Sequence, residues 1–167
     1  SLPGRAAYSS SKAALLGLAL FALGACNDPA KDKTKAETGE AKQAQAVAAD
    51  ATKLDIDPAT SKVEWTGSKV SASHPGGFKS FKGTIALVGN DAEKSSVTID
   101  IDTDSLYTEP ANLVTHLKSK DFFDVTTYPK ATFASTSIQK GAEKGKPNVS
   151  GTIKLHGVTN GITFPAT

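Results

Sequence analysis

The middle of the chain holds a histidine followed by two aspartates, whose types and spacing could support acid–base chemistry. His116 precedes Asp121 and Asp124, and an imidazole beside a carboxylate can transfer protons as a general acid–base pair. The aspartates also flank Phe122 and Phe123, which favours a structural role. Carboxylates accept hydrogen bonds from backbone N–H groups in turns, and burial stabilises each phenylalanine by roughly 2–3 kcal/mol. We therefore predict no catalytic residues here and expect both phenylalanines to pin a short helix against a sheet.

The three histidines of the chain, His74, His116 and His156, are numerous enough to supply the ligands of a zinc site. They fall in three separate segments, which we assign to a loop, a helix and the end of a strand. Nothing in their spacing requires these segments to converge. We predict no metal site and no cofactor, and we keep a metal-dependent enzyme that uses the three histidines as an alternative.

Three aspartates alternate along one predicted strand and would project from the same face of a sheet. Asp100, Asp102 and Asp104 could bind a cation, or they could form a solvated outer surface. The intervening positions hold apolar residues, including Ile99 and Ile101. We interpret the aspartates as the solvated outer face and the apolar residues as the inward face.

The elements that position these residues are short strands separated by turns. Apolar and polar residues alternate with a period of two, which is typical of half-buried strands. The candidate strands are residues 53–57, 62–65, 81–88, 96–106, 130–138, 149–155 and 161–164. We assign HPGG at 74–77 to a turn, and residues 112–123 to a helix because their apolar residues have helical spacing. The sequence predicts an all-β domain at 51–167, an antiparallel sandwich or barrel with a short helix between strands.

The first 26 residues are predicted to form an export and anchoring signal. Lys12 precedes an apolar run, Ala13 to Leu23, that is shorter than the roughly 20 residues needed to span a bilayer. The run leads into LGAC, which resembles the lipobox of bacterial lipoproteins and implies that Cys26 is acylated. An ordinary secretory signal that contains a cysteine is the alternative. The lipobox implies a lipid-anchored protein of the bacterial cell envelope that faces the periplasm or the outer surface.

Residues 27–50 separate this signal from the domain and contain Val47 as their only large apolar residue. Such a segment cannot bury enough surface to offset the entropy of ordering. We therefore predict a disordered linker that holds the domain clear of the membrane.

Composition excludes several classes of function. The net charge is +2, from 19 basic and 17 acidic residues, so the basic surplus typical of a nucleic-acid-binding protein is missing. The sole cysteine excludes an internal disulfide. No glycine-rich phosphate loop follows a predicted strand, which excludes the common nucleotide-binding motifs.

Five blocks of the domain resemble the YceI-like family and occur in the same order. They are LDIDPATSKVEW, HPGGFKSFKGTI, SSVTIDIDTDSL, HLKSKDFFDVTTYPKATFASTSI and VSGTIKLHGVTNGITF. The resemblance implies an antiparallel, lipocalin-like barrel that holds a polyisoprenoid or similar amphiphilic lipid in an apolar tunnel, with no enzymatic activity. Leu113 and Val114 stand where the family usually carries a basic and an acidic residue. Family members also continue beyond this point, so we expect an incomplete barrel, C-terminally truncated at Thr167.

The predicted function is that of a membrane-tethered binding protein for an isoprenoid or quinone-like lipid. Whether the protein forms a homodimer is left open. We expect the tunnel to be lined by Val63, Trp65, Phe81, Ile85, Val97, Ile99, Ile101, Phe133, Ile153 and Leu155. Lys79 and Lys82 are candidate contacts for the polar head of the lipid. Composition alone does not distinguish a lined tunnel from a core filled by side chains. The alternative is therefore a periplasmic stress or interaction module that has a filled core and no lipid ligand.

Overall fold

The computed structural model of the protein describes residues 29–32, 35–69, 72–141 and 145–166. The predicted signal segment with Cys26 lies outside the described residues. Within the described part of the chain, no helix is both long and apolar enough to cross a membrane.

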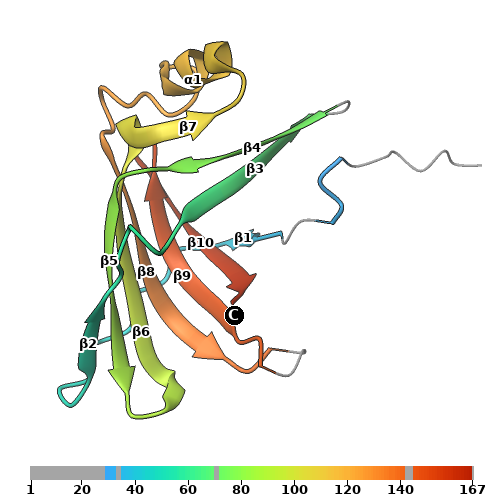
Figure 1. Ribbon diagram of the computed structural model, residues 1–167. Helices are drawn as coiled ribbons and strands as arrows, with labels where there is room; N and C mark the ends of the chain where they lie inside the picture. The colour runs from blue at the N-terminus through green and yellow to red at the C-terminus, as the bar shows by residue number, and fades with distance from the viewer. Residues whose placement is uncertain (1–28, 33–34, 70–71, 142–144, 167) are drawn as a thin grey trace, which may run out of the picture.

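The described residues form two antiparallel sheets and one α-helix (Figure 1). The larger sheet has the strand order β1 (Glu37–Gly39), β10 (Val158–Pro165), β9 (Asn148–Leu155), β8 (Lys130–Gln139), β6 (Asp91–Asp102), β5 (Phe81–Val88) and β2 (Thr52–Asp55). The smaller sheet has the order β3 (Val63–Lys69), β4 (Ala72–Phe78) and β7 (Leu106–Thr108). A 3-10 turn, η1 (Thr103–Ser105), joins β6 to β7, and helix α1 (Ala111–Lys118) follows β7. The predicted all-β, antiparallel fold with one short helix is confirmed.

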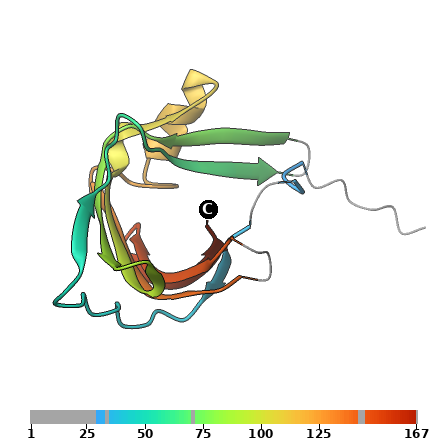
Figure 2. The same cartoon turned by 60° about the horizontal axis from the view of Figure 1, so that its bottom comes forward.

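The larger sheet is strongly curved, and β3 and β4 lie across its open side (Figure 2). The two sheets do not join into one closed barrel among the described residues. Side chains of β3 pack against the larger sheet, since Val63 and Trp65 contact the buried cluster that contains Ile101 and Ala131. The face of the larger sheet that lies under β3 and β4 is called the inner face below.

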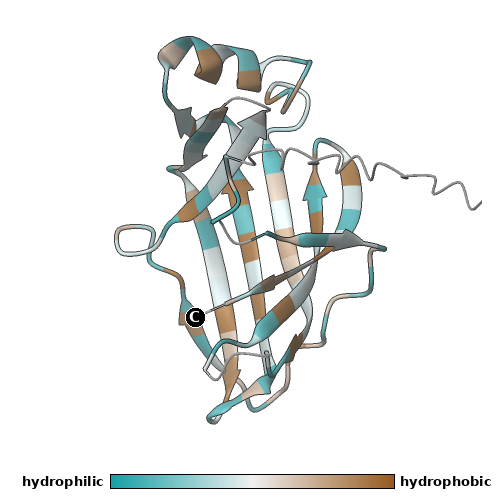
Figure 3. Ribbon diagram, turned by 90° about the vertical axis from the view of Figure 1, so that its right-hand side faces the viewer, coloured by the Kyte–Doolittle hydropathy of each residue, from teal (hydrophilic) through white to brown (hydrophobic). Residues whose placement is uncertain are grey.

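Hydropathy alternates along the strands of the larger sheet, as their colours in Figure 3 show. The strand register places the apolar and the polar residues on opposite faces. Ile99 of β6 pairs with Gly83 of β5 and with Phe133 of β8. One residue further along β6, Asp100 pairs with Lys82 and Thr132 on the opposite, outer face. This separation follows from the period of two, because successive side chains of a strand point to opposite faces.

The three aspartates lie beside lysines, although Asp104 falls in η1 and not, as predicted, in one strand with Asp100 and Asp102. Nitrogen–oxygen distances are 3.8 Å for Lys82 and Asp100, 3.7 Å for Lys130 and Asp102, and 3.0 Å for Lys118 and Asp104. The carboxylates are therefore partnered by surface ammonium groups, as expected of a solvated outer face.

Residues 35–50 differ from the predicted disordered linker. Strand β1 pairs with β10 through Gly161–Thr163, and the chain then crosses the outer face of the sheet toward β2 (Figure 2). The backbone N–H of Lys42 donates to the hydroxyl of Thr152 at 3.1 Å, and that hydroxyl donates to the Lys42 carbonyl at 2.6 Å. The backbone N–H of Gln45 donates to the Ser135 carbonyl at 2.9 Å. The prediction failed because these contacts use backbone groups, which leave no apolar pattern in the sequence.

Two further local predictions are corrected. The HPGG sequence lies inside β4 and not in a turn, because Gly76 and Gly77 pair with Trp65 and Glu64 of β3. The helix is also shorter than predicted. It ends at Lys118, where the N–H of Ser119 donates to the His116 carbonyl, and turns follow it.

Candidate functional site

The inner face carries two adjoining clusters of apolar side chains. The first, near α1, is built on Phe78, Ile101, Leu106 and Ala131, and the second, further along the sheet, is built on Phe133, Ile138 and Val149. Ile99 packs against both clusters. The inner face is therefore one continuous apolar surface that runs along the strands.

Nine of the ten residues predicted to line a tunnel contribute to these clusters. The first cluster takes Val63, Trp65, Phe81, Ile99, Ile101 and Leu155, and the second takes Val97, Ile99, Phe133 and Ile153. Ile85 belongs to neither cluster and is partly buried beside Leu54 and Val97. Most of the nine are only partly buried, although they face the interior of the fold. Whether they line a ligand stays a prediction.

The structure adds apolar residues that the sequence patterns did not place on this face. They come from β4, β7 and α1, and they are Phe78, Leu106, Val114 and Leu117. The alternation of β4 is obscured by its proline and two glycines, and β7 is only three residues long. A period of two is hard to detect in such segments, so only their spatial position reveals the role.

Trp65 lies against the backbone of the β3–β4 hairpin, because two glycines leave room for its indole. A Cβ atom at Gly76 would overlap the indole atom Cζ2, and a Cβ atom at Gly67 would stand 3.4 Å from Cζ3. The indole Nε1 is buried and has no hydrogen-bond partner among the described residues. The indole ring therefore lies in apolar surroundings, where it packs against the first apolar cluster.

The residues considered for acid–base chemistry hold turns and do not form a constellation. The ring of His116 stands edge-on to Phe122, with centroids 4.7 Å apart. The carbonyl of Asp124 accepts the N–H groups of Thr127 at 3.0 Å and Tyr128 at 2.8 Å. The backbone of Asp124 thus does what we expected of its carboxylate, and its positive φ of 41° places it at a sharp turn.

Only one of the two adjacent phenylalanines pins the helix. Phe123 stands edge-on to Phe78 with ring centroids 5.8 Å apart, and it packs against the first apolar cluster. Phe122 does not pack against this cluster; it contacts the ring of His116 and is 47% exposed. The expectation that both are buried is wrong, because consecutive side chains in this turn point in different directions.

The three histidines do not converge in the described residues. His116 contacts Phe122, and the ring of His156 stands edge-on to Tyr128 at 4.8 Å. Among the described residues, no three side chains of histidine, aspartate, glutamate or cysteine are placed to hold a metal ion.

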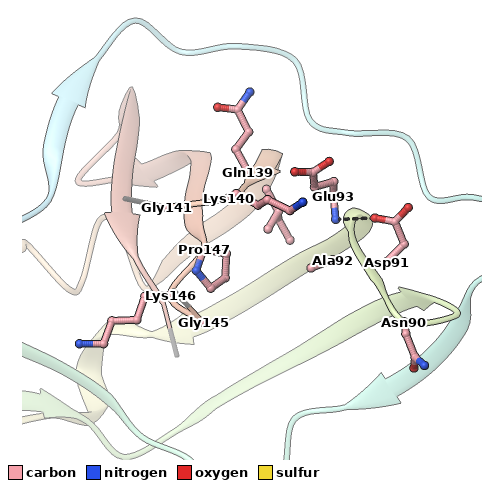
Figure 4. A pocket seen from close by; sticks show the side chains of 11 residues that line it. Asn90, Asp91, Ala92, Glu93, Gln139, Lys140, Gly141, Gly145, Lys146 and Pro147 are labelled. Atoms are coloured by element: carbon pink, nitrogen blue, oxygen red, sulfur yellow. Dashed lines mark hydrogen bonds between the residues drawn. The ribbon is translucent and has the colours of Figure 1, made fainter. Parts of the chain in front are cut away.

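Each end of the inner face carries a pocket. A shallow, open groove of about 750 Å³ lies between β7 and α1, and its lining includes Leu106 and Val114 from the first apolar cluster. A cavity of about 640 Å³ lies at the other end, where the β5–β6 turn approaches the end of β8 (Figure 4). Of the residues that line this cavity, Ile138 belongs to the apolar clusters, and most of the others are polar or charged.

Asp91 organises the polar end. Its carboxylate accepts the N–H of Glu93 at 3.0 Å, drawn as a dashed line in Figure 4, and its distance to the Lys94 ammonium is 3.1 Å. The hydrogen bond from Lys94 is the largest of the effects that lower the pKa of Asp91 below its ordinary value. The β5–β6 turn at this end of the sheet is thus held by a surface ion pair.

Residues 54–167 match the YceI-like domain. The chain belongs to the YceI-like family. Among curated members, it is 38% identical over 124 residues to a UPF0312 protein of Pseudomonas putida strain W619, and 36% identical over 124 residues to one of Pseudomonas fluorescens strain SBW25. Each alignment covers 74% of this chain and 64% of the relative, so the chain spans less than two thirds of the length of these proteins.

Solved YceI-family structures share the fold. BcnA of Burkholderia cenocepacia superimposes with a TM-score of 0.61 at 30% identity, over 67% of this chain and 70% of BcnA. The YceI protein of Campylobacter jejuni gives a TM-score of 0.50 at 28% identity, over 65% of this chain and 63% of that protein. The similarity covers the antiparallel, lipocalin-like architecture.

Proposed function

We propose that this YceI-like protein binds a polyisoprenoid or a similar long amphiphilic lipid against its inner face. The observation that carries the proposal is the continuous apolar surface under β3 and β4. Around its buried centres, many of its large side chains remain only partly buried, including Trp65, Ile99 and Ile153. Among the described residues, the largest completely buried side chains are those of Thr103 and Ser135. A core filled by its own side chains would bury most of its large apolar residues more completely.

Burial of the lipid tail supplies the driving force in this proposal. Each CH₂ group removed from water contributes about 0.8 kcal/mol, so a five-carbon isoprene unit contributes roughly 4 kcal/mol before the costs of association. The surface is elongated because both clusters lie along the same strands and share Ile99. An extended chain matches such a surface better than a compact ligand does.

The polar head of the lipid belongs at the α1 end of the inner face in this proposal. Lys82 lies on the outer face beside Asp100, which removes it as a candidate head contact. Lys79 remains a candidate, since it lines the groove between β7 and α1 and its ammonium lies 5.8 Å from the centre of the Tyr107 ring.

Membrane tethering through acylated Cys26 is part of the same proposal. It is supported by the LGAC sequence and by the apolar run before it. The measurement is the intact mass of the mature protein from a bacterial host, with Cys26→Ser as the control. A wild-type mass without added acyl chains would exclude the anchor and leave the lipid-binding proposal standing.

Lipid binding is tested with two arginine substitutions on adjacent residues of β6. Ile99→Arg places a charge on the inner face, where we expect it to abolish saturable binding of a fluorescent prenyl probe. Thr98→Arg places the same charge on the outer face and should leave binding unchanged. Circular dichroism of both variants checks that the sheet still forms.

Organic extraction of the wild-type protein, followed by mass spectrometry, identifies any co-purified lipid. If neither extraction nor the probe reveals a bound chain, the partly buried inner face is not a lipid site. The interaction module without a lipid ligand would then be the better account.

A further inference from the structure

Helix α1 is only loosely embedded at the edge of the apolar inner face. None of its eight residues is fully buried, and β7 is the element that it contacts most. Its partly buried residues Val114 and Leu117 face the first apolar cluster. The helix therefore covers the end of the inner face without being part of its close-packed interior.

The groove between β7 and α1 borders the interior of the fold. Leu106, which is only 4% exposed, lines this groove and is also a central member of the first apolar cluster. Val114 contributes to both as well. Widening the groove by a displacement of α1 would therefore connect solvent directly with the apolar inner face.

Besides the packing of Val114 and Leu117, an ion pair and a ring contact hold α1 and the turn after it in place. The Lys118 ammonium lies 3.0 Å from the Asp104 carboxylate of η1. Phe123 packs edge-on against Phe78 of β4 at 5.8 Å. Within the turn, the N–H of Phe123 donates to the carbonyl of Leu117 at 2.9 Å, so the helix and Phe123 would move as a unit.

Two other parts of the larger sheet offer less suitable routes to the inner face. The larger sheet is continuously hydrogen-bonded from β2 to β10, and a lipid cannot pass through paired strands. The opposite end of the sheet carries the surface ion pair between Asp91 and Lys94. An apolar chain that crossed this end would have to displace hydrated charges.

We propose that residues 111–123 form a lid and that the lipid reaches the inner face by passing between β7 and α1. This inference rests on the proposed lipid-binding function and adds the route and the gating element. The closed lid is favoured by the Lys118–Asp104 ion pair, so loss of the pair raises the fraction of open molecules. When access is limited by this fraction, the association and dissociation rate constants rise together, and the equilibrium affinity stays the same.

The experiment measures both rate constants by stopped-flow fluorescence on the full chain with the fluorescent prenyl probe. Lys118→Ala and Asp104→Asn each remove the ion pair but change the net charge in opposite directions. We expect both variants to raise both rate constants about two- to fivefold, the range for a partly exposed ion pair. A direct effect of charge on the lipid head would instead shift the two variants in opposite directions. Lys118→Arg keeps the pair and should restore the wild-type rates.

The matched control is Lys94→Ala, which removes the 3.1 Å ion pair with Asp91 at the opposite end of the sheet. It should leave both rate constants unchanged. Wild-type rates in Lys118→Ala and Asp104→Asn, or equal acceleration in Lys94→Ala, would overturn the lid while leaving lipid binding intact. Failure of the wild-type protein to bind the probe would overturn the proposed function and the lid with it.

Discussion

Because Trp65 lies on Gly76, we predict that a single methyl group added at residue 76 disturbs the β3–β4 hairpin that covers the inner face. In Gly76→Ala, the new Cβ would overlap the indole at Cζ2 and stand 2.7 Å from both the indole Cη2 and the backbone carbonyl oxygen of Tyr107. The carbonyl cannot move freely, because β7 is paired with β4 at this point. The indole must therefore shift.

The expected loss of stability follows from two opposing effects. Overpacking typically costs about 1–3 kcal/mol. Replacing glycine by alanine restricts the unfolded chain and contributes about 0.4–1 kcal/mol in the opposite direction. We expect a net decrease of about 1–2 kcal/mol in the free energy of unfolding, which lowers the urea midpoint by roughly 1 M.

Gly67→Ala is the matched control, since it adds the same methyl group beside the same ring. Its Cβ would stand 3.4 Å from Cζ3 and 3.9 Å from Cε3, distances of ordinary contact. We expect its stability to be unchanged or up to about 1 kcal/mol higher.

Urea unfolding followed by tryptophan fluorescence is the assay, because Trp65 is the only tryptophan of the chain. The emission of folded Gly76→Ala should shift to longer wavelength as the indole moves, while that of Gly67→Ala should not. If Gly76→Ala matches the wild type in both urea midpoint and emission wavelength, the Trp65 indole does not pack on Gly76, and the prediction is wrong.

Three further predictions concern other parts of the fold. Thr152→Val removes the hydroxyl that bonds twice to the Lys42 backbone, so hydrogen exchange of the Lys42 amide should accelerate by about two- to tenfold with the central strands unaffected. Lys94→Ala should raise the pKa of Asp91, which carboxyl NMR measures. That pKa is lowered in the folded protein. The ion pair therefore stabilises the fold above the ordinary aspartate pKa, and this stabilisation is lost as the pH falls through the lowered pKa. Phe122→Ser should change the free energy of unfolding by less than about 0.5 kcal/mol, since the side chain is 47% exposed, and a larger loss in urea unfolding would mean that Phe122 is buried.

The longer strands could be predicted from the sequence because the alternation of apolar and polar residues that marks them lies within each strand. Val97, Ile99 and Ile101 alternate with polar residues, and the backbone geometry of a strand converts that alternation into two faces. The same local reasoning placed Asp100 on the outer surface. It also selected nine residues that the structure brings into the two apolar clusters.

What only the tertiary structure decided depends on contacts between residues far apart in the sequence. Gly76 lies in a strand because its missing side chain accommodates Trp65 from the neighbouring strand. Residues 35–50 lie on the sheet because backbone groups find partners on β8, β9 and β10, which come about a hundred residues later. Likewise, the pairing of Lys118 with Asp104 depends on where α1 lies relative to η1. Composition and periodicity describe what a segment can bury, whereas strand register and three-dimensional proximity determine what it meets.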